Sequence, residues 1–426
     1  MDNLTTINEA MINQPIINIG MIGHVANGKS SIVKEVTNIS TQKYASEKQK
    51  NITIKLGYAN AKIYKCPSCE APECYQAGHS SEYSKECDIC NSPMTLVTHV
   101  SFVDCPGHIK FMSTMVSGKC VMDTSIMVEA ISNQQLPAPQ TLEHMNALKM
   151  GNIPIDIVCL NKCDLVNKET TLNNISTLKK AFENTILEKA KLVPVSATFA
   201  INMDVLCELI TQIPVPVRNL TDNIKMIIIR SFNINKPGSD ISELKGGVVG
   251  GSINRGTVRV GDIVKLLPGF VKKSEKKKYR YVYSPLKAQI LSISSEENKL
   301  EYAIPGGLIG VQLDIDPALT TNDGLAGNIL TTFTATDINV FEELALKYTL
   351  IDSNEELTVD EKIQININAN NTDGTITKII PEEQSIIIKL EYPVAASVND
   401  VVTICNNSRI YGSGIILEGL ICKIQT

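Results

Sequence analysis

The feature that most constrains this chain is the stretch "GMIGHVANGKSSIV", which begins at Gly20 and reads G-x-x-x-x-G-K-S from Gly23 to Ser30. It follows the apolar run "PIINI" and precedes residues that can form a helix, the setting of a phosphate-binding loop. In such a loop, backbone N–H groups and the positive end of the helix surround phosphate oxygens. Lys29 would reach the β- and γ-phosphates, and Ser30 would place its hydroxyl on Mg²⁺. The predicted phosphate-binding residues are Gly23, Val25, Ala26, Asn27, Gly28, Lys29, Ser30 and Ser31.

A second motif predicts which base is bound. The apolar run in "VCLNKCDLV", residues 158–166, ends in N-K-x-D. The carboxylate of Asp164 can accept hydrogen bonds from both N1–H and N2–H₂ of guanine, whereas adenine would leave it unpaired at a cost. Asn161 would either bond N7 of the base or hold the phosphate loop in place, and further on "VPVSA" can donate backbone N–H groups to guanine O6. The predicted guanine-binding residues are Asn161, Lys162, Asp164, Ser196, Ala197 and Thr198.

A third motif, "HVSFVDCPGH" at residues 99–108, lies between the other two. Asp104 ends an alternating strand and suits a carboxylate that holds Mg²⁺ through water. The N–H of Gly107 can contact the γ-phosphate, and His108 could orient the attacking water, as a glutamine does in other GTPases. We therefore assign catalytic roles to His108, Asp104 and Gly107, and expect GTP hydrolysis.

The segment "CPSCEAPECYQAGHSSEYSKECDIC" carries two C-x2-C pairs separated by a polar stretch. Thiolates of Cys66, Cys69, Cys87 and Cys90 can meet around one tetrahedral zinc at this spacing. Because the stretch has little to bury, metal would supply its stability. The alternative is four unrelated cysteines in a loop. Cys74 is not expected to be a ligand, although His79 could replace one cysteine.

Alternating apolar strands and helical stretches over residues 15–213 predict an α/β P-loop GTPase domain with a doubly wound, mostly parallel sheet. Strands are expected near 16–22, 99–104, 125–130, 155–160 and 192–196. Helices are expected near 29–38, 108–118, 139–150, 172–190 and 202–211.

After the linker "IPVPVR" the pattern changes to short strands separated by Gly and Pro, which predicts two all-β barrel domains. Asp373-Gly374 is a favourable hairpin turn. The basic run "KKSEKKKYR" at 272–280 is either a solvated hairpin loop or a contact for RNA phosphates. The expected domains are an N-terminal tail at 1–14, a GTP-binding domain at 15–217 with the zinc-knuckle insertion at 66–90, and β-barrel domains at 218–338 and 339–426.

Composition sets the cellular context. The 426 residues carry a net charge of −5, which argues against a protein that coats nucleic acid nonspecifically. No apolar run reaches the roughly 18 residues of a membrane helix, and the polar N-terminus lacks the features of a signal peptide. We therefore expect a cytoplasmic protein with no membrane partner. Twelve cysteines would be unusual as disulfides in a reducing cytosol.

Several stretches resemble the translational GTPases related to elongation factor Tu: "GHVANGKSS", "NITIKLGYANAKIYKC", "VSFVDCPGH", "NKCDLV" and "PVSA". The second of these, with "IRSFNINKPG", "LKGGVVGGSI" and "YAIPGGLIGV", resembles the gamma subunits of eukaryotic and archaeal translation initiation factor 2 specifically. The resemblance runs from about residue 15 to the C-terminus. One departure is Asn27, where that family usually has histidine.

The resemblance implies roles for residues that no spacing singles out. Thr53 would join Ser30 and Asp104 on Mg²⁺ when switch I closes on GTP. Val25 and Ile52 would form an apolar gate near His108. Tyr58 and Ala59 would line the pocket for the aminoacylated tRNA end, where an aromatic ring can stack on the terminal adenosine.

The implied function is a GTP-dependent carrier that delivers methionyl initiator tRNA to the small ribosomal subunit, with GTP hydrolysis as the release switch. The implied partners are the alpha and beta subunits of the factor, a GTPase-activating protein and a nucleotide-exchange factor; the cofactors are GTP/GDP, Mg²⁺ and structural Zn²⁺. One alternative is an elongation-type carrier such as the selenocysteine-specific factor, which usually has a further C-terminal extension. Another is a nonenzymatic GTP-dependent scaffold.

Overall fold

The computed structural model describes residues 3–42, 47, 53, 55–133, 135–236, 238, 240, 244–274, 280–352, 355–406 and 409–425. The chain forms two compact units, residues 1–217 with 295–298 and residues 218–294 with 299–426. No helix in the described ranges combines the length and the apolarity that a membrane crossing requires.

The first unit is built on a seven-stranded sheet with strand order β3-β2-β4-β1-β5-β6-β7. Strands β4, β1, β5, β6 and β7 run parallel to one another. Every residue of β1 and of β5 is buried, as expected for central parallel strands covered on both faces. The strands are β1 (Ile17–Ile22), β2 (Gly57–Lys65), β3 (Tyr75–His79), β4 (Thr95–Asp104), β5 (Thr124–Ala130), β6 (Ile155–Asn161) and β7 (Lys191–Pro194).

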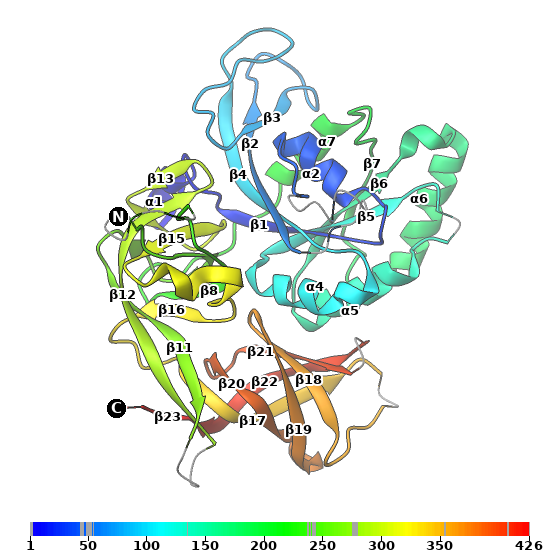
Figure 1. Cartoon of the computed structure of the whole chain (residues 1–426). Helices are drawn as coiled ribbons and strands as arrows, with labels where there is room; N and C mark the ends of the chain where they lie inside the picture. Colours follow the sequence, from blue (N-terminus) through cyan, green and yellow to red (C-terminus); the bar gives the residue numbers. More distant parts are fainter. Residues whose placement is uncertain are drawn as a thin grey trace. The chain divides into compact units, whose positions relative to one another are not determined.

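Helices cover both faces of this sheet, with α2 and α7 on one face and α4 and α5 on the other (Figure 1). The doubly wound arrangement expected from the sequence is therefore confirmed. The helices are α1 (Asn3–Ala10), α2 (Lys29–Thr37), α4 (Met112–Gly118), α5 (Pro139–Met150), α6 (Lys168–Phe182) and α7 (Met203–Thr211).

The structure corrects two helix boundaries. The helix expected at 172–190 is α6, which begins earlier because the side chain of Asn167 caps it by accepting a hydrogen bond from Thr170 N. It ends before Asn184, whose φ of 60° is incompatible with a continuing helix. The helix expected at 108–118 starts as a 3₁₀ turn at Ile109–Phe111.

Strands β2 and β3 were not expected from the sequence. They extend the sheet by antiparallel pairing, β2 with β4 and β3 with β2. Gly57 is opposite Asp104 in this register, so the chain that follows Thr53 enters the sheet beside the end of β4. The cysteine-rich segment continues from β2.

The second unit contains the two predicted β-barrels, and each has six main strands. In the first barrel, β11 pairs with both β16 and β12 and so closes the ring. Its strands are β8 (Lys225–Phe232), β9 (Val248–Arg255), β11 (Ile263–Lys273), β12 (Tyr281–Ser295), β15 (Ile309–Leu313) and β16 (Ile329–Thr332), with short β10 (Val258–Arg259), β13 (Asn298–Leu300), β14 (Tyr302–Ala303) and β23 (Lys423–Ile424).

The second barrel closes in the order β17-β20-β19-β18-β21-β22 around an interior of buried Ile, Leu, Val and Phe side chains. Its strands are β17 (Asn339–Leu350), β18 (Lys362–Ile367), β19 (Asn370–Ile380), β20 (Ser385–Ala396), β21 (Val401–Asn406) and β22 (Arg409–Ile421). A domain boundary at 338/339 remains our proposal.

The hairpin turn expected at Asp373-Gly374 is wrong. Both residues lie inside β19, opposite Gln364 and Ile363. The turn falls instead at residues 368–369, because Ile367 pairs with Asn370 and Asn368 takes the positive φ of 55° that a tight hairpin needs.

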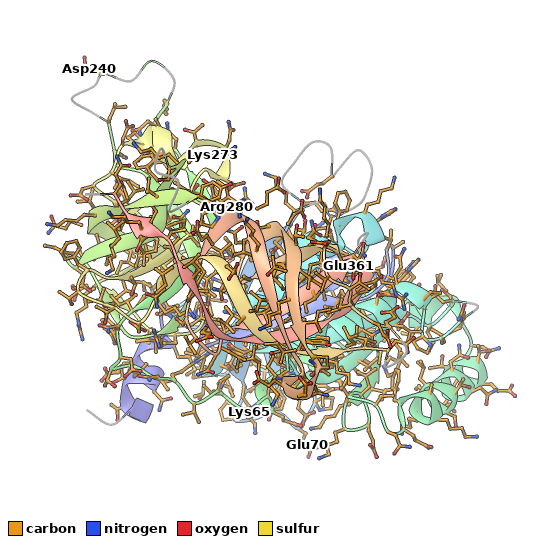
Figure 2. All side chains as sticks on the ribbon, turned by 90° about the horizontal axis from the view of Figure 1, so that it is seen from below. Lys65, Glu70, Asp240, Lys273, Arg280 and Glu361 are labelled. Carbon is orange, nitrogen blue, oxygen red and sulfur yellow. The ribbon has the colours of Figure 1, made fainter. Side chains whose placement is uncertain are left out.

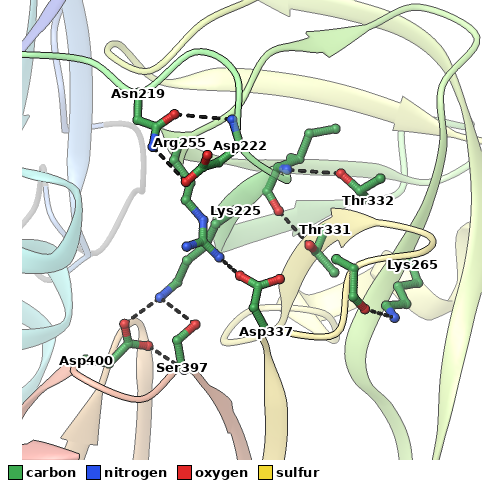
Figure 3. A network of polar contacts seen from close by, with 12 residues as sticks. Asn219, Asp222, Lys225, Arg255, Lys265, Thr331, Thr332, Asp337, Ser397 and Asp400 are labelled. Atoms are coloured by element: carbon green, nitrogen blue, oxygen red, sulfur yellow. Dashed lines mark hydrogen bonds and ion pairs between the residues drawn. The ribbon is translucent and has the colours of Figure 1, made fainter.

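An ion pair joins the two barrels (Figure 3). Lys225 Nζ, on β8, lies 2.5 Å from Asp400 Oδ1 and 3.4 Å from Ser397 Oγ, both between β20 and β21. Arg255 also pairs with Asp337. Because Lys225 is 7% exposed, Asp400 and Ser397 rather than water surround its ammonium group.

The basic run at 272–280 is only partly described, because residues 275–279 lie outside the described ranges. Lys273 and Arg280, at its two ends, are labelled in Figure 2. Arg280 Nη1 donates to Leu390 O at 2.9 Å, and its guanidinium lies 5.3 Å from the ring centre of Tyr281. This arginine therefore contributes to packing within the second unit, and an RNA contact by the run stays a prediction.

Candidate nucleotide-binding site

A cavity of about 270 Å³ gathers residues that follow β1, β4, β6 and β7 in the first unit. This is the edge of a doubly wound sheet where ligands bind. All but one of its lining residues belong to the predicted phosphate, guanine, Mg²⁺ or catalytic sets, and the exception is Gln42. The lining residues are Val25, Ala26, Gly28, Lys29, Ser30, Ser31, Gln42, Thr53, Gly107, Asn161, Lys162, Ala197 and Thr198. A larger cavity of about 660 Å³, in the second unit, contains none of the predicted phosphate, guanine, Mg²⁺, zinc or catalytic residues, although Arg280 of the basic run lines it.

The loop between β1 and α2 depends on a glycine at its end. Gly28 caps α2 with a φ of 96°, and a Cβ atom there would lie 2.1 Å from Nδ2 of Asn161. Only glycine therefore allows the loop to approach β6 this closely. At the other end, the N–H of Gly23 donates to Nδ1 of His144 at 3.1 Å.

Lys29 is buried beneath this loop. Its Nζ donates to the carbonyl oxygens of Gly23 and His24 at 2.8 and 3.0 Å. Burial lowers the pKa of Lys29, while the charge of Asp104 raises it. A buried ammonium held by carbonyl oxygens is well suited to bind a phosphate oxygen.

The three predicted Mg²⁺ ligands meet at one point. Ser30 Oγ donates to Asp104 Oδ2 at 2.6 Å and lies 3.0 Å from Thr53 Oγ1. Thr41 Oγ1 also donates to Asp104 Oδ2 at 2.6 Å. Asp104 is fully buried, and burial raises its pKa. Its Oδ1 atom has no hydrogen-bond partner among the described residues. This set of hydroxyl and carboxylate oxygens fits Mg²⁺, which prefers oxygen ligands.

Gly107 lies directly against the phosphate loop. A Cβ atom there would be 2.5 Å from Lys29 Nζ and 2.9 Å from Val25 N, so any side chain would collide with the loop. His108 follows it but does not line the cavity. The Nδ1 atom of His108 accepts a hydrogen bond from Lys110 N at 3.1 Å, and its ring lies 6.1 Å from that of Phe111. Its role with the attacking water stays a prediction.

The guanine loop is tied to the phosphate loop through Asn161. Its Nδ2 donates to Asn27 O at 2.8 Å, and its Oδ1 accepts from Ala197 N at 3.2 Å. Of the two roles considered for Asn161, the structure favours the one that holds the loops together. Lys162 adopts a φ of 64°, and Asp164 is exposed on a short 3₁₀ turn beyond it.

The four predicted zinc ligands also converge. Ligand atoms of Cys66, Cys69, Cys87 and Cys90 lie within 4.8 Å of one another. The sulfur of Cys90 is 3.4 Å from that of Cys66 and 3.6 Å from that of Cys69. Tetrahedral zinc with bonds of about 2.3 Å would place its sulfurs roughly 3.8 Å apart, so the donor set fits zinc.

Cys74 and His79 stay outside this cluster. Cys74 is buried in the same group as Cys66 and Cys87 and its carbonyl accepts from Cys66 N at 2.8 Å, but its sulfur is not one of the four converging ligand atoms. His79 Nδ1 instead bonds Ser81 Oγ at 2.7 Å. Two cysteine pairs are therefore sufficient to form the cluster.

The residues expected to meet tRNA lie on β2. Tyr58 is half-buried, opposite Val103, whereas Ala59 is fully buried. The side chain of Ala59 is therefore not accessible to a partner in this conformation. Ile52, expected to form a gate with Val25, lies outside the described residues.

Sequence reasoning missed four polar residues at the site: Thr41, Glu129, Asn133 and His144. Thr41 lies in a polar stretch without a motif. Glu129 had a usable signal, because it is a lone acid inside the apolar strand "TSIMVEA". A charged residue there needs partners close by.

Comparison with known proteins agrees with this geometry. Residues 14–215 match the elongation factor Tu GTP-binding domain. The chain is 38% identical to the eukaryotic translation initiation factor 2 subunit gamma of Schizosaccharomyces pombe, over 100% of this chain and 99% of the relative. It is 39% identical to the translation initiation factor 2 subunit gamma of Methanococcus maripaludis, over 96% of this chain and 100% of the relative.

Among solved structures, the chain is similar to the translation elongation factor SelB of Methanococcus maripaludis in complex with a GTP analogue. The TM-score is 0.70 at 24% identity, over 95% of this chain and 80% of that one. This likeness shows the shared fold alone. The identity to the gamma subunits is higher and spans nearly their full length. The chain therefore belongs to the gamma-subunit family of eukaryotic and archaeal translation initiation factor 2, GTPases of translation initiation.

Proposed function

We propose that this GTPase carries methionyl initiator tRNA to the small ribosomal subunit in the cytoplasm and releases it when GTP is hydrolysed. In this proposal the chain works with the alpha and beta subunits of the factor. A GTPase-activating protein and a nucleotide-exchange factor set the timing of its cycle.

The contact between Ser30 and Thr53 carries this proposal. Thr53 Oγ1 lies 3.0 Å from Ser30 Oγ, and β2 begins four positions after Thr53 at Gly57. A change at the phosphate site that moves Thr53 therefore pulls on the strand that bears Tyr58. Switch segments of GTPases are ordered by γ-phosphate and Mg²⁺ and released on hydrolysis.

For hydrolysis, we propose that Ser30, Asp104 and Thr53 hold Mg²⁺, which would neutralise charge on the phosphate oxygens when bound. Lys29 binds the β- and γ-phosphates. The N–H of Gly107 contacts the γ-phosphate, and His108 orients the attacking water. The close approach of Gly107 to Lys29 supports this assignment.

We also propose that the four-cysteine cluster holds one structural zinc. Four protein ligands leave no open coordination position, so we assign the metal no catalytic role. Its place at the end of β2 supports a role in bracing the strand that follows switch I.

Filter binding with purified methionyl initiator tRNA, methionyl elongator tRNA and either GTP or GDP tests the proposal. We expect tight binding only for the initiator tRNA with GTP. Equal affinity for both tRNAs, or equal affinity in GTP and GDP, would contradict it.

A further inference from the structure

The side chain of Asn27 points away from the nucleotide cavity. It belongs to the phosphate loop, yet it does not line the cavity and is only 1% exposed. Its Nδ2 donates to Val128 O at 2.8 Å and to Glu129 Oε2 at 3.0 Å. Its Oδ1 accepts from Asn133 Nδ2 at 3.2 Å. Both N–H groups of this amide are therefore used behind the loop.

Glu129 is the centre of this arrangement. It lies near the end of β5, is fully buried, and accepts a hydrogen bond on each of its carboxylate oxygens. Asn27 donates to Oε2, and the backbone N–H of Ala138 donates to Oε1 at 3.2 Å. Burial raises the pKa of Glu129, and the hydrogen bonds that it accepts act in the opposite direction. Because an ionised carboxylate only accepts, donors on both oxygens favour its charged form.

The phosphate loop needs such an anchor. Ala26, next to Asn27, has a φ of 64°, which is unfavourable for a residue with a Cβ atom. A backbone conformation of this kind persists only where surrounding contacts hold it. Glu129 is also among the charges that raise the pKa of Lys29 against the effect of burial.

We propose that Asn27 and Glu129 are a positioning pair, whose hydrogen bond behind the phosphate loop keeps the loop in its nucleotide-binding shape. Neither side chain needs to touch the nucleotide. Affinity for guanine nucleotides then depends on a donor at position 27 meeting an acceptor at position 129, or on the same pair with the roles exchanged.

An exchange of the two functional groups tests this idea. Asn27→Asp puts a carboxylate against the carboxylate of Glu129. Glu129→Gln replaces one acceptor by a donor, so its N–H₂ group faces either the amide N–H₂ of Asn27 or the backbone N–H of Ala138. In the double variant, the new amide at position 129 can donate to the new carboxylate at position 27, while its oxygen still accepts from Ala138 N. Val128 O loses its donor, and Thr141 and Asn133 lose a carboxylate partner, so we expect partial rather than full recovery.

The readout is the dissociation constant for a fluorescent GDP analogue and for a nonhydrolysable GTP analogue. We expect each single variant to bind about 10- to 100-fold more weakly, the loss expected when a buried polar group is left without its partner. The double variant should regain at least half of that loss on a logarithmic scale. Thermal unfolding without nucleotide, measured in parallel, reports stability separately.

Ser125→Ala is the matched control. Ser125 lies on the same strand and is fully buried, and its Oγ donates to Pro154 O at 2.8 Å. This variant should lose stability but keep nucleotide affinity. Wild-type affinity in both single variants would overturn the proposal. So would a double variant that regains stability without regaining affinity.

If the single variants at positions 27 and 129 do not fold, Asn133→Ala tests the proposal instead. It removes the donor to Asn27 Oδ1 and the interaction of Asn133 with Glu129, and should weaken nucleotide binding about two- to fivefold, since a neutral hydrogen bond contributes modestly. Unchanged affinity in this variant would overturn the proposal. These experiments measure nucleotide binding alone. Their results therefore test the positioning pair whether or not the chain also carries tRNA.

Discussion

The side-chain amide of Asn161 donates to the carbonyl oxygen of Asn27 at 2.8 Å and so links the guanine loop to the phosphate loop. The oxygen of the same amide, Oδ1, accepts a hydrogen bond from Ala197 N. One side chain therefore joins the loop predicted to bind the base to the loop predicted to bind the phosphates. Asp164, three positions after Asn161, is exposed and is the residue predicted to recognise guanine.

Replacing Asp164 with Asn should reduce affinity for GTP and increase affinity for XTP. The new amide can donate to the oxygen that replaces the guanine N2–H₂ group, whereas it no longer accepts from both guanine donors. Competition binding of GTP and XTP measures the change. An unchanged preference for GTP would remove Asp164 from the base pocket.

Cys66→Ser should remove zinc, whereas Cys74→Ser should retain it. Both cysteines are buried in the same segment, but only Cys66 belongs to the four-sulfur cluster. Elemental analysis of the wild-type protein should find about one zinc per chain. Full zinc retention after all four ligand cysteines are changed to serine would exclude this site.

The free energy of unfolding should decrease as the pH falls below about 6.5, the ordinary pKa of histidine. His99 is fully buried, with Nδ1 3.0 Å from Met11 O and Nε2 2.9 Å from Ser80 Oγ. Burial lowers its pKa to about 3. The folded protein therefore keeps His99 neutral while the unfolded chain takes up a proton, which favours unfolding at low pH.

His99→Gln isolates this effect. At pH 7.5 the variant should be less stable by about 1–3 kcal/mol, because buried hydrogen bonds are lost. Between pH 6.5 and 5 its stability should decline less steeply than that of the wild type. Burial also lowers the pKa of His144 to about 3, so this residue still contributes part of the pH dependence of stability in the variant. Denaturant unfolding across this pH range would show parallel curves if His99 contributes nothing.

Much of the fold followed from local patterns, because the parallel strands are continuous apolar runs and the motifs lie where those strands end. The site residues converged for the same reason: parallel strands bring their carboxyl ends to one edge. Strands β2 and β3 could not be predicted, since they form by pairing with β4 and with each other rather than by their own periodicity. The turn at Asp373-Gly374 failed because barrel closure places these residues in β19.

The contacts behind the phosphate loop also could not be predicted from a sequence motif. Asn27 could be placed in the loop from its pattern, but the direction of its side chain depends on Glu129, 102 residues away in sequence. Thr41 joins Asp104 across 63 residues. Partners of this kind are set by tertiary structure, and one sequence carries no signal for the pairing.

Tyr58→Ala should bind GDP and GTP normally but hold initiator tRNA less tightly, by about 1–3 kcal/mol if the ring stacks on a base. Tyr58→Phe keeps the ring and serves as the control, with affinity close to that of the wild type. Filter binding in one buffer compares the three proteins. Wild-type tRNA affinity in Tyr58→Ala would exclude the contact.

The most direct test of the account is the affinity of Thr53→Ala for methionyl initiator tRNA in the presence of GTP. Thr53 Oγ1 lies 3.0 Å from Ser30 Oγ, and the account makes this hydroxyl the link between the phosphate site and β2. Thr53→Ser, which keeps the hydroxyl, is the matched control. We predict that Thr53→Ala binds GDP almost as tightly as the wild type but loses GTP-dependent tRNA binding, while Thr53→Ser retains it. Wild-type tRNA affinity in Thr53→Ala would contradict the proposed link from nucleotide to tRNA.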